Sequence, residues 1–75
     1  MNKIKVRYGI GNETIELVPI GTTVGQILSN PNIKTKLGFG ENVHGVVDGV
    51  AQGACSVLAD GDEINVETTV GTKQG

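Results

Sequence analysis

Apolar and polar residues alternate strictly at the start of the chain. Ile4, Val6 and Tyr8 fall on one face of residues 3–8, and three cations fall on the other face: Lys3, Lys5 and Arg7. This period of two is typical of a half-buried strand, because successive side chains of a strand point to opposite faces. The sequence therefore predicts a first strand over residues 3–8.

A return strand is expected over residues 14–20, after a glycine-rich turn. Its alternation predicts that Ile15 and Leu17 face inward and that Glu16 faces outward. Pro19 lacks a backbone N–H, so this strand is expected at an edge of the sheet.

The pattern then changes to helical spacing. Thr23 and Gln26 match a capping box, in which each side chain accepts a hydrogen bond from the other residue's backbone N–H. One apolar stripe follows, formed by Val24, Ile27 and Leu28. The sequence predicts a helix over residues 23–30.

A second short helical piece is predicted over residues 31–37. Asn30 is suited to cap it, Pro31 to occupy its first position, and Gly38 to end it. Its buried residues would be Ile33 and Leu37.

Two further strands are expected, over residues 43–48 and 63–70. Turn signals at Asp48-Gly49 and Asp60-Gly61 separate them from an irregular or 3₁₀ segment at residues 54–58. In the last strand the predicted inward residues are Ile64, Val66 and Thr68, and the outward residues are Asn65, Glu67 and Thr69.

The order strand, strand, helix, strand, strand predicts an α+β fold of ββαββ type: a mixed four-stranded sheet with a helix on one face. The first and last strands would lie side by side in its centre. On the open face, Lys5 and Arg7 are then expected between Glu16 and Glu67.

The 75 residues allow one small domain, expected at residues 1–70, followed by a flexible tail at 71–75. Tyr8 and Phe39 are the two aromatic residues, so the core is mainly aliphatic. The net charge of −2 is spread along the chain without a basic block. The predicted partners therefore exclude nucleic acid, and the basic stripe is interpreted as a solvated, balanced face.

The N-terminus shows a strand pattern and not a signal peptide. No apolar run approaches the ~20 residues that cross a bilayer, so no membrane partner is expected. One cysteine fits a reducing compartment. We therefore expect a cytoplasmic protein, or one assembled inside a cell into a particle.

Three motifs resemble the ThiS/MoaD branch of the β-grasp (ubiquitin-like) fold. They are the helix start at residues 23–28, the segment at residues 46–50, and above all Leu58-Ala59-Asp60-Gly61-Asp62-Glu63-Ile64. The resemblance implies a β-grasp domain. It also implies a sulfur carrier, adenylated at a terminal glycine carboxylate and then loaded as a thiocarboxylate.

The tail departs from that family. Its carriers end in two adjacent glycines, which are thin enough to thread a narrow enzyme channel. Here Gly71 and Gly75 are separated by three residues, and Gln74 occupies the penultimate position. Gly71 and Gly75 are therefore candidate site residues only if the protein is a carrier.

No catalytic, cofactor-binding or metal-binding residues are predicted. Cys55 lacks a neighbouring base or cation, so it is interpreted as a small, partly buried filler. His44 alone does not make a zinc site and is expected on a strand surface.

The acidic residues and the first glycine pair are interpreted as turns. The spacing of Asp48, Asp60, Asp62 and Glu63 lacks the ligand series of a calcium loop. The Gly9-Ile10-Gly11 segment is too short to hold a phosphate and is not followed by a helix, so a hairpin turn is predicted.

Two functions stay open. The first is a non-enzymatic ubiquitin-like module that binds a protein partner, as an accessory, regulatory or structural component such as a phage or virion protein. The second is a sulfur or modifier carrier activated at its C-terminal glycine by an adenylating enzyme. Neither requires enzymatic activity of the chain itself.

Overall fold

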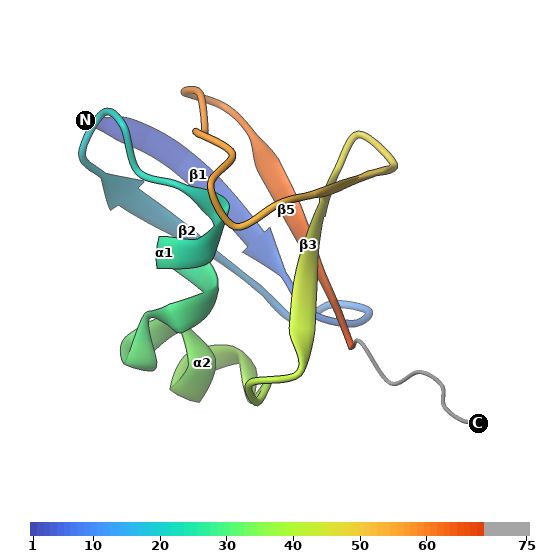
Figure 1. The fold of residues 1–75 in the computed structure, drawn as a ribbon. Helices are drawn as coiled ribbons and strands as arrows, with labels where there is room; N and C mark the ends of the chain where they lie inside the picture. Colours follow the sequence, from blue (N-terminus) through green and yellow to red (C-terminus); the bar gives the residue numbers. More distant parts are fainter. Residues whose placement is uncertain (69–75) are drawn as a thin grey trace.

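The computed structural model of the chain describes residues 1–68, which form a five-stranded mixed sheet with two short helices on one face (Figure 1). The strand order is β2-β1-β5-β3-β4, with β1 and β5 parallel and the other pairs antiparallel. The elements are β1 Asn2–Arg7, β2 Glu13–Val18, α1 Val24–Ser29, α2 Pro31–Leu37, β3 Val43–Val47, β4 Val50–Gln52 and β5 Glu63–Thr68. This order confirms that the first and last strands form the centre of the sheet.

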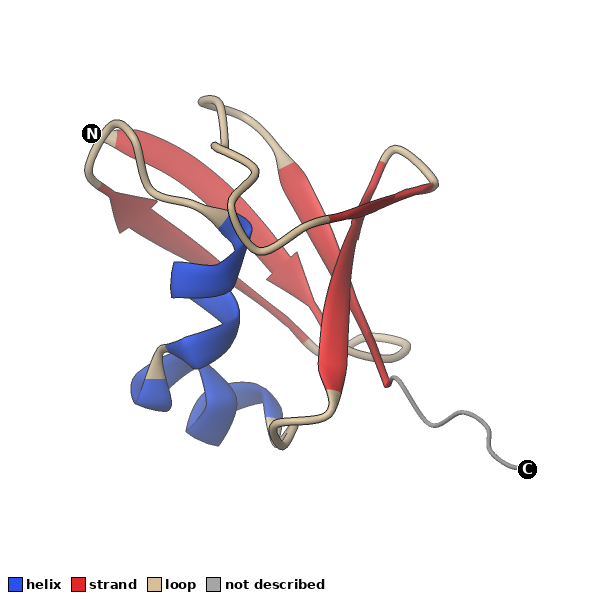
Figure 2. Ribbon diagram, viewed as in Figure 1, coloured by secondary structure: helices blue, strands red, loops and turns tan. Residues whose placement is uncertain are grey.

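The core lies between the sheet and the helix layer, as Figure 2 shows. Ile4 and Val6 of β1 and Ile64 of β5 are fully buried there, which confirms the alternation predicted for both strands. Tyr8 and Phe39 close one end of the core, with ring centroids 5.5 Å apart. The other core residues are Val18, Val24, Ile27, Ile33, Leu37, Leu58 and Val66.

Both helices begin as the sequence predicts. The Gln26 backbone N–H donates to Thr23 Oγ1 at 3.3 Å, and the Thr23 N–H donates to Gln26 Oε1 at 3.0 Å. Asn30 Oδ1 accepts from two N–H groups of α2, and Gly38 ends α2 with a φ of 84°. The two predicted helical pieces are separate helices, so the single helix of the ββαββ order is divided in two, because Asn30 ends the first and caps the second.

The sheet has a fifth strand that the sequence prediction missed. Asp48 (φ 54°) and Gly49 (φ 79°) form the two-residue turn typical of a tight hairpin, so the chain returns at once as β4. Only Val50–Gln52 pair with β3, which is too short a segment to show an alternating pattern. The following residues 54–58 are irregular, as expected.

The facing of β2 is the reverse of the prediction. Ile4 lies opposite Glu16, and Lys5 lies opposite Ile15. Opposite residues of an antiparallel pair share a face, so Ile15 and Leu17 lie on the open face, and Glu16 lies on the helix side. The hydrophobic pattern is misleading here because β2 is an edge strand, as Pro19 indicated, and the register of the hairpin decides its facing.

The ion pairs of the open face also differ from expectation. Arg7 contacts Glu13 at 3.1 Å and Glu63 at 3.3 Å, and Lys5 lies 3.9 Å from Glu13. Glu16 instead binds Lys36 of α2 at 2.9 Å, because it lies on the other face. Glu67 lies 3.5 Å from His44 Nε2.

The last strand is described as far as Thr68. Ile64 and Val66 are buried as predicted, whereas Thr68 is exposed. The predicted end of the strand at residue 70 and the predicted tail at residues 71–75 lie outside the described residues. Within residues 1–68, no helix is long and apolar enough to cross a membrane.

Candidate functional site

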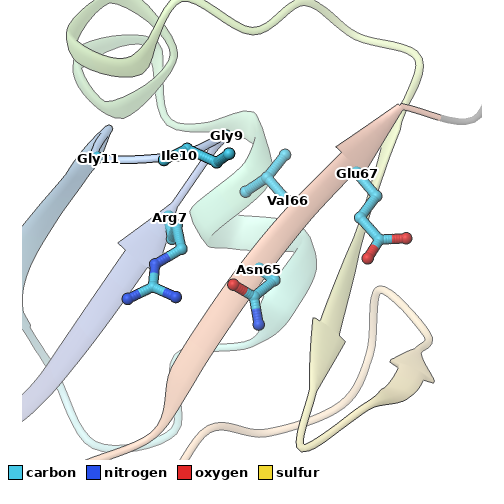
Figure 3. Close-up of a pocket in the computed structure, with 7 residues that line it drawn as sticks. All are labelled: Arg7, Gly9, Ile10, Gly11, Asn65, Val66 and Glu67. Atoms are coloured by element: carbon cyan, nitrogen blue, oxygen red, sulfur yellow. The ribbon is translucent and has the colours of Figure 1, made fainter.

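A hollow of about 490 Å³ lies where the β1–β2 loop meets the end of β5 (Figure 3). It lies where β1 and β5, which are equally long, are staggered: β1 pairs with β5 only up to Arg7 opposite Asn65. Beyond that point β5 continues beside β3 alone. We call this feature the hairpin hollow; its lining residues are Arg7, Gly9, Ile10, Gly11, Asn65, Val66 and Glu67.

The loop of the hairpin hollow is held in a defined conformation. The Tyr8 N–H donates to the Asn12 carbonyl at 2.8 Å, and Asn12 Nδ2 donates to the Leu37 carbonyl at 2.7 Å. Gly9 (φ 83°) and Gly11 (φ 72°) take left-handed conformations that a side chain would strain. Ile10, between them, is therefore presented at the tip of the loop with its side chain fully exposed.

The charges of the hairpin hollow are largely compensated. Figure 3 shows the side chains of Arg7 and Asn65 on the same side of the sheet. The Arg7 guanidinium binds the carboxylates of Glu13 and Glu63, so it does not present an uncompensated positive charge. Such a surface favours an apolar or neutral contact over a strongly charged ligand.

The C-terminal end of β5 lies at this same place. In Figure 1 the end of β5 lies next to the β1–β2 loop. Thr68, the last described residue, is paired with Val43 of β3. The candidate tail residues Gly71 and Gly75 lie outside the described residues.

Three of the four acidic residues singled out in the sequence lie at turns, and the fourth, Glu63, begins β5. Asp60 Oδ1 accepts from the Lys3 backbone N–H at 2.7 Å, and Asp62 Oδ2 accepts from the Ala59 N–H at 2.8 Å. Asp48 occupies the β3–β4 turn. Among residues 1–68, no three metal-ligating side chains gather in one place.

Cys55 and His44 lie apart from the hairpin hollow. Cys55 is exposed in the loop after β4, which corrects its interpretation as a partly buried filler. The chain leaves the sheet after Gln52, the last residue of β4, so the Cys55 thiol lies outside the core. His44 lies on the open face of β3, as expected for a strand-surface residue, and approaches Glu67.

Ile10 is the residue of this surface that sequence reasoning missed. Its segment was interpreted correctly as a hairpin turn, but no contact role was given to the isoleucine. The sequence does contain a signal for such a role: Ile10 is an apolar residue between two glycines, and a turn does not require an apolar residue at that position.

Comparisons with known proteins agree on the fold. No family model and no curated protein matches the chain. Among solved structures, a Pyrococcus furiosus protein assigned as subunit 1 of the molybdopterin converting factor has a TM-score of 0.71 and 25% identity, covering 93% of this chain and all of its own. Ubiquitin from Caldiarchaeum subterraneum has a TM-score of 0.71 and 22% identity, covering 99% and 98%.

A designed protein based on ubiquitin is similar as well, with a TM-score of 0.74 and 15% identity over 99% of this chain and 95% of its own. The chain has a ubiquitin-like β-grasp fold. The resemblance to the MoaD-type β-grasp proteins is thereby confirmed. In this β-grasp domain the hairpin hollow, which is lined by residues 65–67 of β5, is the candidate site.

Proposed function

We propose that the chain is a non-enzymatic β-grasp module that binds a protein partner through the hairpin hollow. The observation that carries the proposal is the complete exposure of Ile10 on a loop closed by the Tyr8–Asn12 hydrogen bond. A side chain on a loop that is hydrogen-bonded to the rest of the fold loses less conformational entropy on binding than one on an unanchored loop, which makes Ile10 a suitable anchor for a partner.

The test is partner binding by Ile10→Ser, with Val57→Ser as the matched control. Val57 is also an exposed apolar residue, but it lies outside the hairpin hollow. The partner is sought by co-expressing the chain with its neighbouring genes and measuring the complexes by mass spectrometry. We expect Ile10→Ser to weaken binding by about tenfold or more, a loss of about 1.4 kcal/mol.

Both variants are expected to fold with a stability within about 0.5 kcal/mol of the parent, as exposed substitutions usually do. The proposal fails if Ile10→Ser binds the partner as well as the parent does. It also fails if Val57→Ser loses binding to the same extent.

The second candidate is a sulfur or modifier carrier. It is supported by the similarity to the molybdopterin converting factor subunit over 93% of this chain. The position of the end of β5 beside an open surface is also what a carrier requires, because an activating enzyme must hold the domain while it reaches the tail. Gln74, in place of a penultimate glycine, argues against it.

Removal of residues 72–75 separates the two candidates. For a binding module, the truncated chain is expected to keep partner binding and stability within about 0.5 kcal/mol. For a carrier activated at Gly75, truncation moves the terminal carboxylate to Gly71 and is expected to abolish or redirect loading. Intact-mass measurement with ATP, a sulfur donor and an adenylating enzyme decides: a gain equal to the difference between sulfur and oxygen, on the full-length chain only, identifies a carrier.

A further inference from the structure

The outer edge of β2 has unused hydrogen-bonding groups. The Lys3 carbonyl accepts from Gly61, and the Lys5 N–H donates to Asp62, so these groups of β1 point toward the β5 side. The backbone groups of Ile4 and Val6 therefore point toward β2, where they pair with Glu16 and Thr14.

The alternate residues of β2 consequently direct their backbone groups away from β1. These residues are Glu13, Ile15 and Leu17. Within residues 1–68, β2 has a neighbouring strand on one side only. The edge therefore presents three N–H and three C=O groups to the surroundings.

Two large side chains along this edge are apolar and exposed. Ile15 and Leu17 lie on the open face with 57% and 64% of their surface accessible. Natural edge strands usually carry charges, prolines or bulges that prevent pairing with another chain. In β2 the proline comes only after the strand, and the two large aliphatic residues sit in its centre.

The acids of this edge are already compensated within the chain. Arg7 and Lys5 lie beside Glu13, and Lys36 binds Glu16 at 2.9 Å. Two such edges therefore approach each other without bringing unpaired like charges together. This internal compensation favours a second copy of the same edge as the occupant.

We propose that β2 is a self-association surface, at which two copies of the chain pair antiparallel about a two-fold axis through Ile15. In this register Ile15 faces Ile15 of the second copy, and Glu13 faces Leu17. All outward groups are then used, giving about six main-chain hydrogen bonds. The proposal goes beyond partner binding at the hairpin hollow and uses a different surface.

The neighbouring registers are less suitable. A shift by one step toward the C-terminus places Glu16 directly opposite Glu16, which is unfavourable for like charges. A shift toward the N-terminus pairs Leu17 with Gly11, outside the strand. The register centred on Ile15 also joins the exposed aliphatic side chains of both copies into one cluster on the open face.

The proposed dimer is expected to be weak because its interface is small. A six-residue edge with two exposed aliphatic residues per copy gives an interface below the ~1,200 Å² of stable complexes. We expect a dissociation constant between about 10 μM and 1 mM, measurable by analytical ultracentrifugation of the full chain.

The disrupting variant is Ile15→Glu. Lys5 lies opposite position 15 in the same chain, so the new carboxylate has a favourable neighbour in the monomer and a like charge across the dimer. We expect it to weaken dimerisation at least about tenfold. Val57→Glu, a charge at another exposed aliphatic position, is expected to leave dimerisation unchanged.

Cysteine cross-linking tests the register in a Cys55→Ser background. Ile15→Cys is expected to form a disulfide-linked dimer, because directly opposite residues are ~5.5 Å apart at Cα, within disulfide range. Leu17→Cys is expected to stay unlinked, because the two copies of residue 17 are about 13 Å apart along the strands.

The proposal is overturned if the chain remains monomeric at about 1 mM. It is equally overturned if Val57→Glu weakens dimerisation as much as Ile15→Glu, or if Leu17→Cys cross-links as readily as Ile15→Cys. Circular dichroism establishes that each variant is folded. If Ile15→Glu is unfolded, the comparison of the two cysteine variants decides.

Discussion

At the scale of single residues, Gly45 is the position where packing is tightest. It lies on β3 beneath α1, and a Cβ atom there would come within 2.8 Å of Val24 Cγ1 and 3.1 Å of Ile64 Cγ2. Both neighbours are branched and buried, so they have little freedom to move away. Glycine at this position is what allows the helix to approach the sheet.

Gly45→Ala is therefore expected to lower the free energy of unfolding by about 1–3 kcal/mol through overpacking. The matched control is Gly53→Ala, because a Cβ atom at position 53 would meet no other atom within 4 Å and the φ of Gly53 is not left-handed. Its stability is expected to stay within about 0.5 kcal/mol of the parent. Urea unfolding measures both, and equal stabilities for the two variants would contradict the packing argument.

The sequence predicts the structure around a residue well where that structure depends only on neighbours in the chain. The capping pair Thr23–Gln26 and the left-handed Gly38 are examples, because their hydrogen bonds and dihedral angles involve neighbours in the chain. Gly45 and Ile10 were not predicted. The first depends on a helix that lies far from it in the sequence, and the second on the orientation of a whole loop.

At the scale of elements, one ion pair joins β2 and α2 beside the apolar core that the two elements share. Lys36 Nζ donates to Glu16 Oε2 at 2.9 Å, and Thr14 Oγ1 donates to the same oxygen at 3.0 Å. The hydrogen bond from Lys36 is the main cause that holds the pKa of Glu16 below its ordinary value. Burial of the carboxylate opposes this shift and is outweighed.

A lowered native pKa gives a definite pH dependence. The ion pair stabilises the fold at pH values above the ordinary carboxyl pKa. This contribution is lost as the pH falls through the lowered pKa of the native state. Glu16→Gln is thus expected to be less stable than the parent at neutral pH, by about 0.2–1 kcal/mol for a partly exposed pair, and equally stable in acid.

The control is Glu41→Gln, an exposed carboxylate that forms no ion pair among the described residues. Its stability relative to the parent is expected to change little between neutral and acidic pH. Thermal melts over a pH series measure both variants. A Glu16→Gln deficit that persists unchanged in acid would show that the ion pair is not its cause.

The same element shows why sequence patterns fail at an edge. The facing of a central strand such as β5 is predicted correctly, because one face of the strand is packed along most of its length. The alternation of apolar and polar residues follows that face. β2 has Ile15 and Leu17 outside and Glu16 toward the helices, so hydrophobicity alone gives the wrong facing. The register follows from the length of the β1–β2 loop, which the pattern does not encode.

At the scale of the whole molecule, the core depends on contacts between the two ends of the chain. β1 and β5 are parallel neighbours in the centre of the sheet, and both helices pack on the face they share. A domain of this size has one core, so its layers are expected to unfold together. This long-range pairing was predicted from the order of elements, because few topologies satisfy that order.

Ile27→Ala in α1 and Val66→Ala in β5 test the joint unfolding of the two layers. Both side chains are buried in the same core, and each substitution is expected to lower the free energy of unfolding by ~2–4 kcal/mol. Tyr8 is the only tyrosine and there is no tryptophan, so fluorescence reports the end of the core where Tyr8 meets Phe39, while circular dichroism reports the backbone of helices and strands. Both probes are expected to show one coincident transition in urea for the parent and each variant, measured in sodium sulfate to keep the folded baseline. Separate transitions for the two signals in Ile27→Ala would contradict the joint unfolding of the two layers.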